Sequence, residues 1–137
     1  MILGIGTDLA SIERIAGVLE EHGSRFVERC FGPAEAEKVE KQAAGNEQLR
    51  AAGYAKRWAA KEACAKALGL GIRNEIYLKD IVVVNNPEGA PSLALSGGAK
   101  QRLTALTPKG MTAHIHISLT DEAQSALAFV VISAERA

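Results

Sequence analysis

The first part of the chain passes from a short apolar run to a segment with helical spacing. Residues 2–7 predict a buried strand, and Asp8 is expected where that strand leaves the sheet. Ser11 is a suitable N-cap for a helix over residues 12–22, because its hydroxyl can accept a hydrogen bond from the first turn. Gly23 supplies the stop signal that ends this helix.

Two more helices are predicted before the middle of the chain. The Gly32-Pro33 pair breaks the pattern, and residues 34–42 favour a short polar helix. A longer helix is expected over about residues 49–68. Gly69 and Gly71 end it, because glycine readily adopts the left-handed backbone found after helix C-termini.

The second half of the chain changes to the two-residue period of strands. It predicts two antiparallel hairpins with a helix, capped by Ser96, between them. The expected elements are a strand over 80–85, a turn over 86–89, a strand over 92–95, a helix over 97–106, a strand over 112–119, a turn over 120–123 and a strand over 126–133. These elements predict one α+β domain, residues 1–137, in which a mostly antiparallel sheet packs against the long helix and shorter helices.

Composition agrees with a globular domain and argues against several functional classes. The chain has 137 residues, of which 47% are hydrophobic, enough for a sizeable core. Sixteen Lys and Arg balance sixteen Asp and Glu, which argues against a nucleic-acid-binding protein with a pervasive basic surface. The segment 48–79 nevertheless carries seven basic and two acidic side chains, so anionic ligands are expected there.

The two cysteines, Cys30 and Cys64, indicate the cellular compartment. They are too few for a disulfide scaffold and are typical of reduced cytosolic thiols. Cys64 lies among alanines and is expected to be a small core residue rather than a nucleophile. No secretory signal is evident and no apolar run approaches the ~20 residues of a membrane-spanning helix, so a cytoplasmic location is expected.

Polar residues of the long predicted helix fall on one stripe. Trp58, Glu62 and Lys66 recur every four residues and therefore share a face. The opposite face consists of small residues suited to close packing on a sheet: Ala60, Ala63, Cys64 and Ala67. Taken alone, the spacing of Glu62 and Lys66 is more typical of a solvated ion pair than of a functional site.

Two other groups of residues have both a structural and a chemical interpretation. Asp8 follows Gly4 and Gly6, which would let another backbone or a ligand approach closely, although an Asp at a strand end often only turns the chain. No dinucleotide or phosphate-loop fingerprint follows these glycines. His114, His116 and Ser118 share one face of a predicted strand, but no further Cys or His completes a zinc site, so structural roles are favoured for the histidines.

Three blocks occur together in a particular order: GIGTDL at 4–9, WAAKEACAKALG at 58–69 and HISLTD at 116–121. This set resembles the holo-[acyl-carrier-protein] synthases, the small bacterial class of 4′-phosphopantetheinyl transferases. The resemblance covers essentially the whole chain. It changes the interpretation of Asp8 and Glu62 from structural to functional.

The resemblance implies roles for individual residues. Asp8 and Glu62 would bind Mg²⁺, and Lys66 would lie beside the phosphates of coenzyme A. His116 would lie in the same site, with Ser118 close by on the same face of its strand. The turn over residues 69–74 would border the cofactor pocket through Gly69 and Gly71.

Two positions in these blocks depart from the family. Leu70 stands where a Thr is commoner, so the side chain at this position has no hydroxyl group. Asp121 replaces a His found in many relatives and receives no role.

The resemblance also implies partners. Apo-acyl carrier protein is typically acidic and would dock on the first helix, which nominates Arg14 and, more weakly, Arg25; each is otherwise an ordinary surface residue. The family forms trimers with the active site between neighbouring subunits, so a homotrimer is expected.

The reaction implied by the resemblance is attack by a carrier serine on the pantetheine-side phosphorus of coenzyme A. The products would be 3′,5′-ADP and holo-acyl carrier protein for fatty acid biosynthesis. Glu62 could accept the serine proton directly or through a metal-bound water. Two alternatives stay open: a module that binds coenzyme A or carrier without chemistry, and a structural domain whose Glu62 and Lys66 form a surface ion pair.

Overall fold

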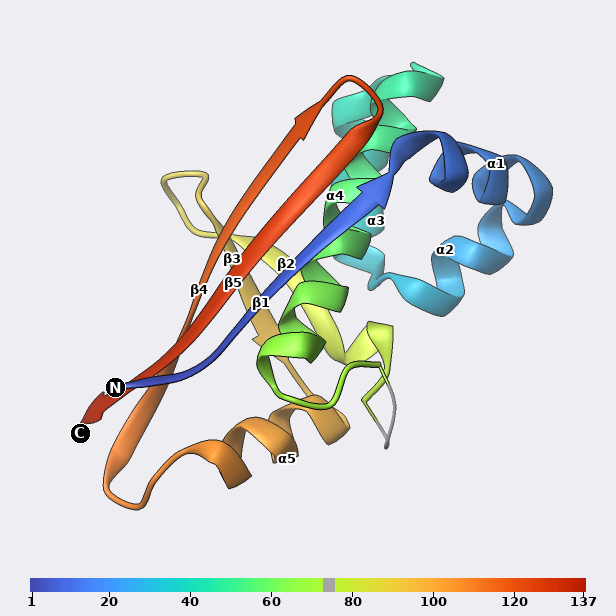
Figure 1. The fold of residues 1–137 in the computed structure, drawn as a ribbon. Helices are drawn as coiled ribbons and strands as arrows, with labels where there is room; N and C mark the ends of the chain where they lie inside the picture. The colour runs from blue at the N-terminus through green and yellow to red at the C-terminus, as the bar shows by residue number, and fades with distance from the viewer. Residues whose placement is uncertain (73–75) are drawn as a thin grey trace.

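The computed structural model describes residues 1–72 and 76–137 (Figure 1). Arg73 and Asn74, which belong to the turn expected to border the cofactor pocket, lie outside the described residues. The elements are, in chain order, β1 (Ile2–Ser11), α1 (Ile12–His22), α2 (Ser24–Cys30), α3 (Pro33–Ala43), α4 (Glu47–Ala67), a 3-10 turn (Leu78–Asp80), β2 (Ile81–Asn85), β3 (Pro91–Leu95), α5 (Gly97–Leu106), β4 (Met111–Glu122) and β5 (Ser125–Arg136).

Two antiparallel sheets form the β part of the fold. The larger one has the strand order β1-β5-β4, and β2 and β3 form the smaller one. Figure 1 shows β4 and β5 as a long twisted hairpin with β1 beside β5. The chain ends lie together at one end of this sheet, where the Met1 amino group donates to the Ala134 carbonyl at 2.7 Å. This arrangement confirms the predicted α+β class with antiparallel pairing.

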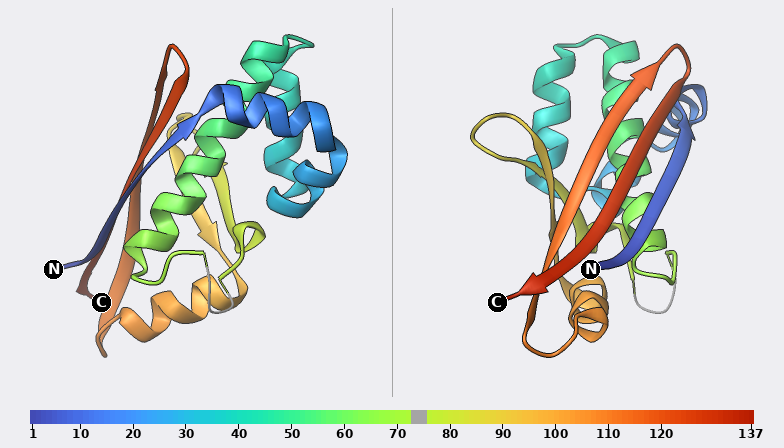
Figure 2. Two further views of the ribbon diagram at one scale, coloured as in Figure 1. Left: turned by 45° about the vertical axis from the view of Figure 1, so that its right-hand side comes forward. Right: turned by 60° about the vertical axis from the view of Figure 1, so that its left-hand side comes forward.

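Helix α4 covers one face of the larger sheet (Figure 2). The residues expected to pack closely are all buried: Ala60, Ala63, Cys64 and Ala67. On the sheet side, Gly4 and Gly6 make this approach possible, because a β-carbon at Gly6 would lie 1.9 Å from the Ala63 carbonyl oxygen. The predicted role of these glycines in close backbone approach is confirmed.

The helix predictions hold to within about two residues at each end for α1, α3, α4 and α5. Ser11 caps α1 by accepting from the Arg14 amide at 3.1 Å, and Gly23 ends this helix with a φ of 52°. Ser96 occupies the predicted N-cap position of α5, although its side chain accepts no hydrogen bond from the helix. Helix α2 was not predicted.

Two strand boundaries correct the sequence interpretation. Strand β1 continues to Ser11, so Asp8 lies within the strand opposite Ala128 rather than where the strand leaves the sheet. The turn expected over 120–123 is also wrong, because residues 120–122 still pair with β5 and the chain reverses only after Glu122. Pairing with a long neighbouring strand extends both segments beyond their apolar runs.

Among the described residues, no helix has the length and apolar character needed to cross a membrane.

Candidate active site

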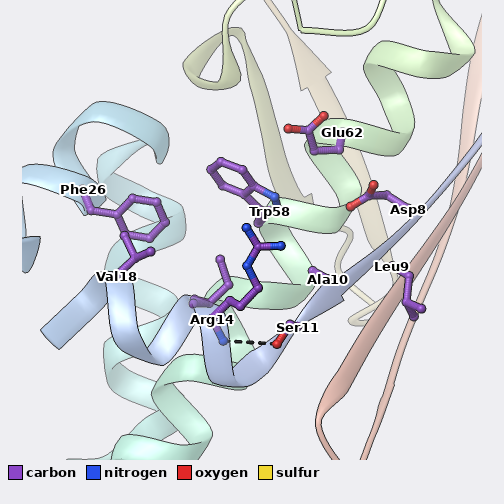
Figure 3. Close-up of a pocket in the computed structure, with 10 residues that line it drawn as sticks. Asp8, Leu9, Ala10, Ser11, Arg14, Val18, Phe26, Trp58 and Glu62 are labelled. Carbon is purple, nitrogen blue, oxygen red and sulfur yellow. Dashed lines mark hydrogen bonds between the residues drawn. The ribbon is translucent and has the colours of Figure 1, made fainter. Parts of the chain in front are cut away.

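Asp8 and Glu62 line the same cavity although 54 positions separate them in the chain. The cavity has a volume of about 460 Å³ and lies between β1, α1, α2 and α4. Figure 3 shows the two carboxylates next to each other at one end of it. Burial and the nearby Asp8 carboxylate raise the pKa of Glu62, and the Lys66 ammonium partly opposes them. The two carboxylates therefore act on each other electrostatically.

Lys66 lies one helical turn beyond Glu62 and forms hydrogen bonds with β1. Its ammonium donates to Asp8 Oδ1 at 3.1 Å and to the Thr7 carbonyl at 3.0 Å. The Lys66 side chain remains 52% exposed, whereas the Asp8 side chain is 17% exposed. A cation thus already lies against Asp8, within reach of solvent.

Local backbone geometry explains why these three groups meet. Gly4, Gly6 and Asp8 alternate on the face of β1 that α4 covers. The missing side chains of the glycines let the helix lie close to the strand, and Asp8 comes next on the same face. Glu62 and Lys66 are four residues apart on α4, so both carboxylates and the ammonium lie at the junction of strand and helix.

The rest of the cavity wall is mainly apolar and includes two aromatic rings and one basic side chain. The rings of Phe26 and Trp58 have centroids 5.9 Å apart, and Val18 lies beside them (Figure 3). Arg14 also lines the cavity, and its backbone amide is held by the Ser11 cap. The wall therefore combines an apolar surface with one guanidinium.

Arg25 lies in α2 beside a second, smaller hollow. This hollow, of about 230 Å³, is lined by His22, Arg25, Phe26 and Arg29. Phe26 lines both cavities, so Arg14 and Arg25 belong to one continuous region of α1 and α2. The sequence did not point to Phe26, because a single aromatic in an unpredicted helix carries no spacing signal.

The C-terminal end of α4 has the backbone geometry expected of a glycine-rich stop. Gly69 and Gly71 have φ values of 87° and 70°. The Gly71 amide donates to the Ala65 carbonyl at 3.0 Å, and the Leu68 carbonyl accepts from Arg102 Nε of α5 at 2.9 Å. Leu70 is half-buried and packs against the core. The turn thus sets where the chain leaves the Lys66 end of the helix.

His116 and Ser118 lie on the opposite face of the sheet from Asp8. Ile5 pairs with Val131, which pairs with His116, and the next residues on this face are Thr7, Phe129 and Ser118. Paired residues point to the same side of a sheet, and Asp8 follows Thr7 in the chain, so Asp8 points to the other side. Within one chain, the structure does not bring the two histidine-strand residues to the carboxylates.

Both histidines have a polar partner on this outer face, a hydroxyl for His116 and a carboxylate for His114. His116 Nε2 lies 2.9 Å from Ser133 Oγ, and His114 Nε2 lies 2.9 Å from Glu135 Oε1. The alternation predicted for this strand is confirmed, since Ile115 and Ile117 are the more buried residues.

Most cations of the basic segment 48–79 are already paired inside the chain. The pairs are Arg50 with Glu40, Lys56 with Asp121, Lys61 with Glu35, and Lys66 with Asp8. Only Lys66 of these lies beside the two carboxylates of the cavity. The excess positive charge read from the sequence is therefore a weaker guide to an anion site than the position of Lys66.

The buried Lys61–Glu35 ion pair was not predicted from the sequence. Both side chains are fully buried, with Lys61 Nζ 2.5 Å from Glu35 Oε1. Lys61 also donates to the carbonyls of Leu78 and Ile81, and Glu35 accepts from the amides of Gly32 and Val83. This network attaches α4 to α3 and β2.

The donor groups of the cavity fit a hard divalent cation. Among residues 1–72 and 76–137, no three His, Cys, Asp or Glu side chains gather around one point, and the candidate metal ligands that these residues bring to the cavity are the two carboxylates of Asp8 and Glu62. Mg²⁺ commonly binds through one or two carboxylates and completes its shell with water and phosphate oxygens. The ammonium on Asp8 shows that this carboxylate attracts a cation.

Comparisons with known proteins agree with this geometry. The sequence model of the 4′-phosphopantetheinyl transferase superfamily matches residues 4–128. A holo-[acyl-carrier-protein] synthase of Rhodopseudomonas palustris (strain TIE-1) is 59% identical over 137 residues, which cover 100% of this chain and 93% of that relative.

Two solved structures have the same fold. The holo-[acyl-carrier-protein] synthase of Neisseria meningitidis has a TM-score of 0.76 at 34% identity, covering 97% of this chain and 99% of that one. The Helicobacter pylori enzyme in complex with coenzyme A has a TM-score of 0.75 at 30% identity, covering 94% and 99%. The chain therefore belongs to the holo-[acyl-carrier-protein] synthase family of the 4′-phosphopantetheinyl transferase superfamily.

Proposed function

We propose that this chain transfers the 4′-phosphopantetheine group of coenzyme A to a serine of apo-acyl carrier protein in a Mg²⁺-dependent reaction. The observation that carries the proposal is the meeting of Asp8, Glu62 and Lys66 at one end of the cavity. Relatives named for this activity, and one crystallised with coenzyme A, support it. Residues 1–137 would act as one domain in the cytoplasm, producing holo-carrier for fatty acid biosynthesis.

The chemistry requires charge neutralisation and positioning. The serine oxygen forms a bond to the pantetheine-side phosphorus, and the bond from that phosphorus to 3′,5′-ADP breaks. Mg²⁺ held by Asp8 and Glu62 would supply Lewis-acid charge neutralisation for the pyrophosphate. Lys66 would add a positive charge beside the phosphates, and Gly69 and Gly71 would shape the adjoining turn.

Glu62 is the proposed proton acceptor for the serine hydroxyl. Its carboxylate lines the cavity next to Asp8, so it is placed to accept the proton of a serine hydroxyl bound there. The proton would pass to Glu62 directly or through water.

The carrier protein is proposed to dock on the α1–α2 region, next to the carboxylates. Arg14 and Arg25 would meet its acidic groups, and Phe26 and Trp58 would offer it an apolar contact between them. Arg14→Glu should raise the KM for the carrier and leave the KM for coenzyme A unchanged. Equal carrier KM values for wild type and variant would place the docking surface elsewhere.

A homotrimer is proposed to complete the site. Four large apolar side chains on the outer sheet face are between 40% and 68% exposed: Ile5, Leu9, Leu127 and Phe129. An apolar patch of this kind is typical of an interface. His116 and Ser118 share this face. Packing of a neighbouring subunit against it would place His116 and Ser118 of one chain near the Asp8 and Glu62 carboxylates of the other chain.

Mixing inactive variants tests this arrangement. Oligomers formed from a mixture of Glu62→Gln and His116→Ala chains should recover activity that neither variant has alone, because some sites combine two intact halves. If both residues acted within one chain, every site would keep a defect and activity would stay absent. Sedimentation would report the number of subunits.

Intact-mass spectrometry tests the reaction itself. Apo-acyl carrier protein incubated with this enzyme, coenzyme A and Mg²⁺ should gain the mass of one phosphopantetheine, and a chelator should abolish the gain. Asp8→Asn and Glu62→Gln should also abolish it, whereas the exposed Glu122→Gln on β4 should not. Binding of coenzyme A without release of 3′,5′-ADP would instead identify a binding module.

A further inference from the structure

The contacts of Lys66 suggest more than a phosphate-binding role. Its ammonium bridges Asp8 Oδ1 and the Thr7 carbonyl, at 3.1 Å and 3.0 Å. Both acceptors belong to β1, so the ammonium is held against the strand rather than directed into solvent. In this position Lys66 neutralises the carboxylate that the proposed function assigns to the metal.

We propose that Lys66 is an internal counter-cation of Asp8 that a divalent metal displaces, and that this displacement frees its ammonium for the phosphates of coenzyme A. The inference rests on the proposed function, since it takes the metal role of Asp8 from there. It also gives an order of assembly. The Lys66 ammonium pairs with the Asp8 carboxylate before the metal binds and with the phosphates of coenzyme A afterwards.

Exposure makes this exchange possible. The Lys66 side chain is 52% exposed, and its long stem can move the ammonium into solvent at little cost in buried contacts. Asp8, only 17% exposed and fixed within a paired strand, cannot move away in the same manner. The lysine is therefore the partner that leaves when another cation arrives.

Charge balance supports the same conclusion. One ammonium beside the Asp8 and Glu62 carboxylates leaves an excess of one negative charge, whereas a divalent ion in its place neutralises both. With ammonium and metal together on Asp8, the two cations repel each other at short range. Lys66 thus opposes metal binding until it has moved.

The test measures metal affinity in the absence of coenzyme A and carrier. Mn²⁺ takes the same oxygen ligands as Mg²⁺, and the free ion is quantified by electron paramagnetic resonance. Lys66→Met keeps the aliphatic stem and removes the charge. Salt screens part of the repulsion between Lys66 and the metal. The Kd of this variant for Mn²⁺ should still be lower than that of wild type by about fivefold or more. Lys66→Gln should change the Kd in the same direction.

A matched control lies on the same helix. Lys56 is paired with Asp121 at 3.2 Å and is 33% exposed, so Lys56→Met also removes one positive charge from a salt bridge of α4. Its Kd for Mn²⁺ should equal that of wild type. An equal gain in both variants would reveal a general charge effect and would overturn the proposal.

The remaining outcomes separate this inference from the proposed function. If Asp8→Asn abolishes Mn²⁺ binding while Lys66→Met binds as wild type does or more weakly, displacement is wrong and the metal site stands. If Asp8→Asn binds Mn²⁺ as tightly as wild type, Asp8 is not a ligand, and both the inference and the proposed metal site are overturned.

Discussion

Gly6 of β1 lies against the backbone of Ala63 in α4 so closely that a β-carbon on Gly6 would be 1.9 Å from the Ala63 carbonyl oxygen. It would also lie 2.8 Å from the Ala67 amide nitrogen. Both contacts are with helix backbone, which cannot rotate away as a side chain can. The distance between Asp8 and Glu62 therefore depends on a glycine at this position.

Gly6→Ala should destabilise the protein by about 3 kcal/mol or more, because strand and helix must separate to admit the methyl group. Separation also moves Glu62 away from Asp8, so activity should fall in the fraction that remains folded. Chemical denaturation measures the first effect and the transfer assay the second. Gly17→Ala is the control, because nothing lies within 4 Å of a β-carbon there. That change in the middle of α1 should stabilise the protein by about 0.5–1 kcal/mol; similar results for the two variants would contradict the packing argument.

The buried Lys61–Glu35 pair gives a second prediction. Glu35→Gln or Lys61→Met alone should cost ~3–5 kcal/mol of unfolding free energy, since each leaves an uncompensated charge in the core. The double variant should lose less than the sum of the single losses, because no buried charge remains. Denaturant titration of the four proteins gives the coupling energy.

The exposed pair Lys56–Asp121 is the comparison for this cycle. Its side chains are 33% and 38% exposed, and removal of either partner should cost below about 1 kcal/mol. Additive losses for the Lys61 and Glu35 variants would show that the two buried groups do not interact energetically.

Elements with a long repeating pattern were predictable from the sequence, and short ones were not. Helix α4 has many residues of helical spacing and a glycine stop, so its limits were predicted to within about two residues. Helix α2 spans only seven residues and buries only Cys30, too little for a periodic signal. The ends of β1 and β4 depend on pairing partners far away in the chain, which local pattern does not contain.

The site residues show the same limit. Spacing placed Glu62 and Lys66 on one helix face, and the family blocks connected them with Asp8. Which face of the sheet carries His116 follows only from the register between β1, β5 and β4. Lys61 gave no signal either, because a lysine in a charged helix is normally solvent-exposed, and its buried partner Glu35 lies on another helix.

Cysteine chemistry gives a third prediction. Burial raises the pKa of the Cys64 thiol to about 12, with Lys61 acting in the opposite direction. Burial also raises the pKa of Cys30. Because the thiolate is the reactive form, iodoacetamide at pH 8 should label neither thiol in the native protein and both after denaturation. Mass spectrometry counts the labels, and rapid labelling of native Cys64 would contradict its place in the core.

Hydrogen bonds between α3 and α4 should make a pH-dependent contribution to stability. Glu40 accepts from Tyr54 Oη at 2.7 Å and from Arg50 Nε at 2.8 Å and 2.9 Å. Burial raises the pKa of the Glu40 carboxyl, but the hydrogen bonds from Tyr54 and Arg50 outweigh it, so the pKa lies below the usual 4.5. The folded protein therefore binds the Glu40 proton less readily than the unfolded chain does.

A carboxyl with a lowered pKa stabilises the fold above its unfolded pKa, and this stabilisation disappears as the pH falls through the folded value. Glu40→Gln should thus be less stable than wild type at pH 7, and the difference should shrink below about pH 4.5. Denaturation across this pH range measures it. Glu37→Gln, an exposed position on the same helix, should show no such convergence. A difference between wild type and Glu40→Gln that stays constant with pH would mean that Glu40 contributes through packing rather than through its charge.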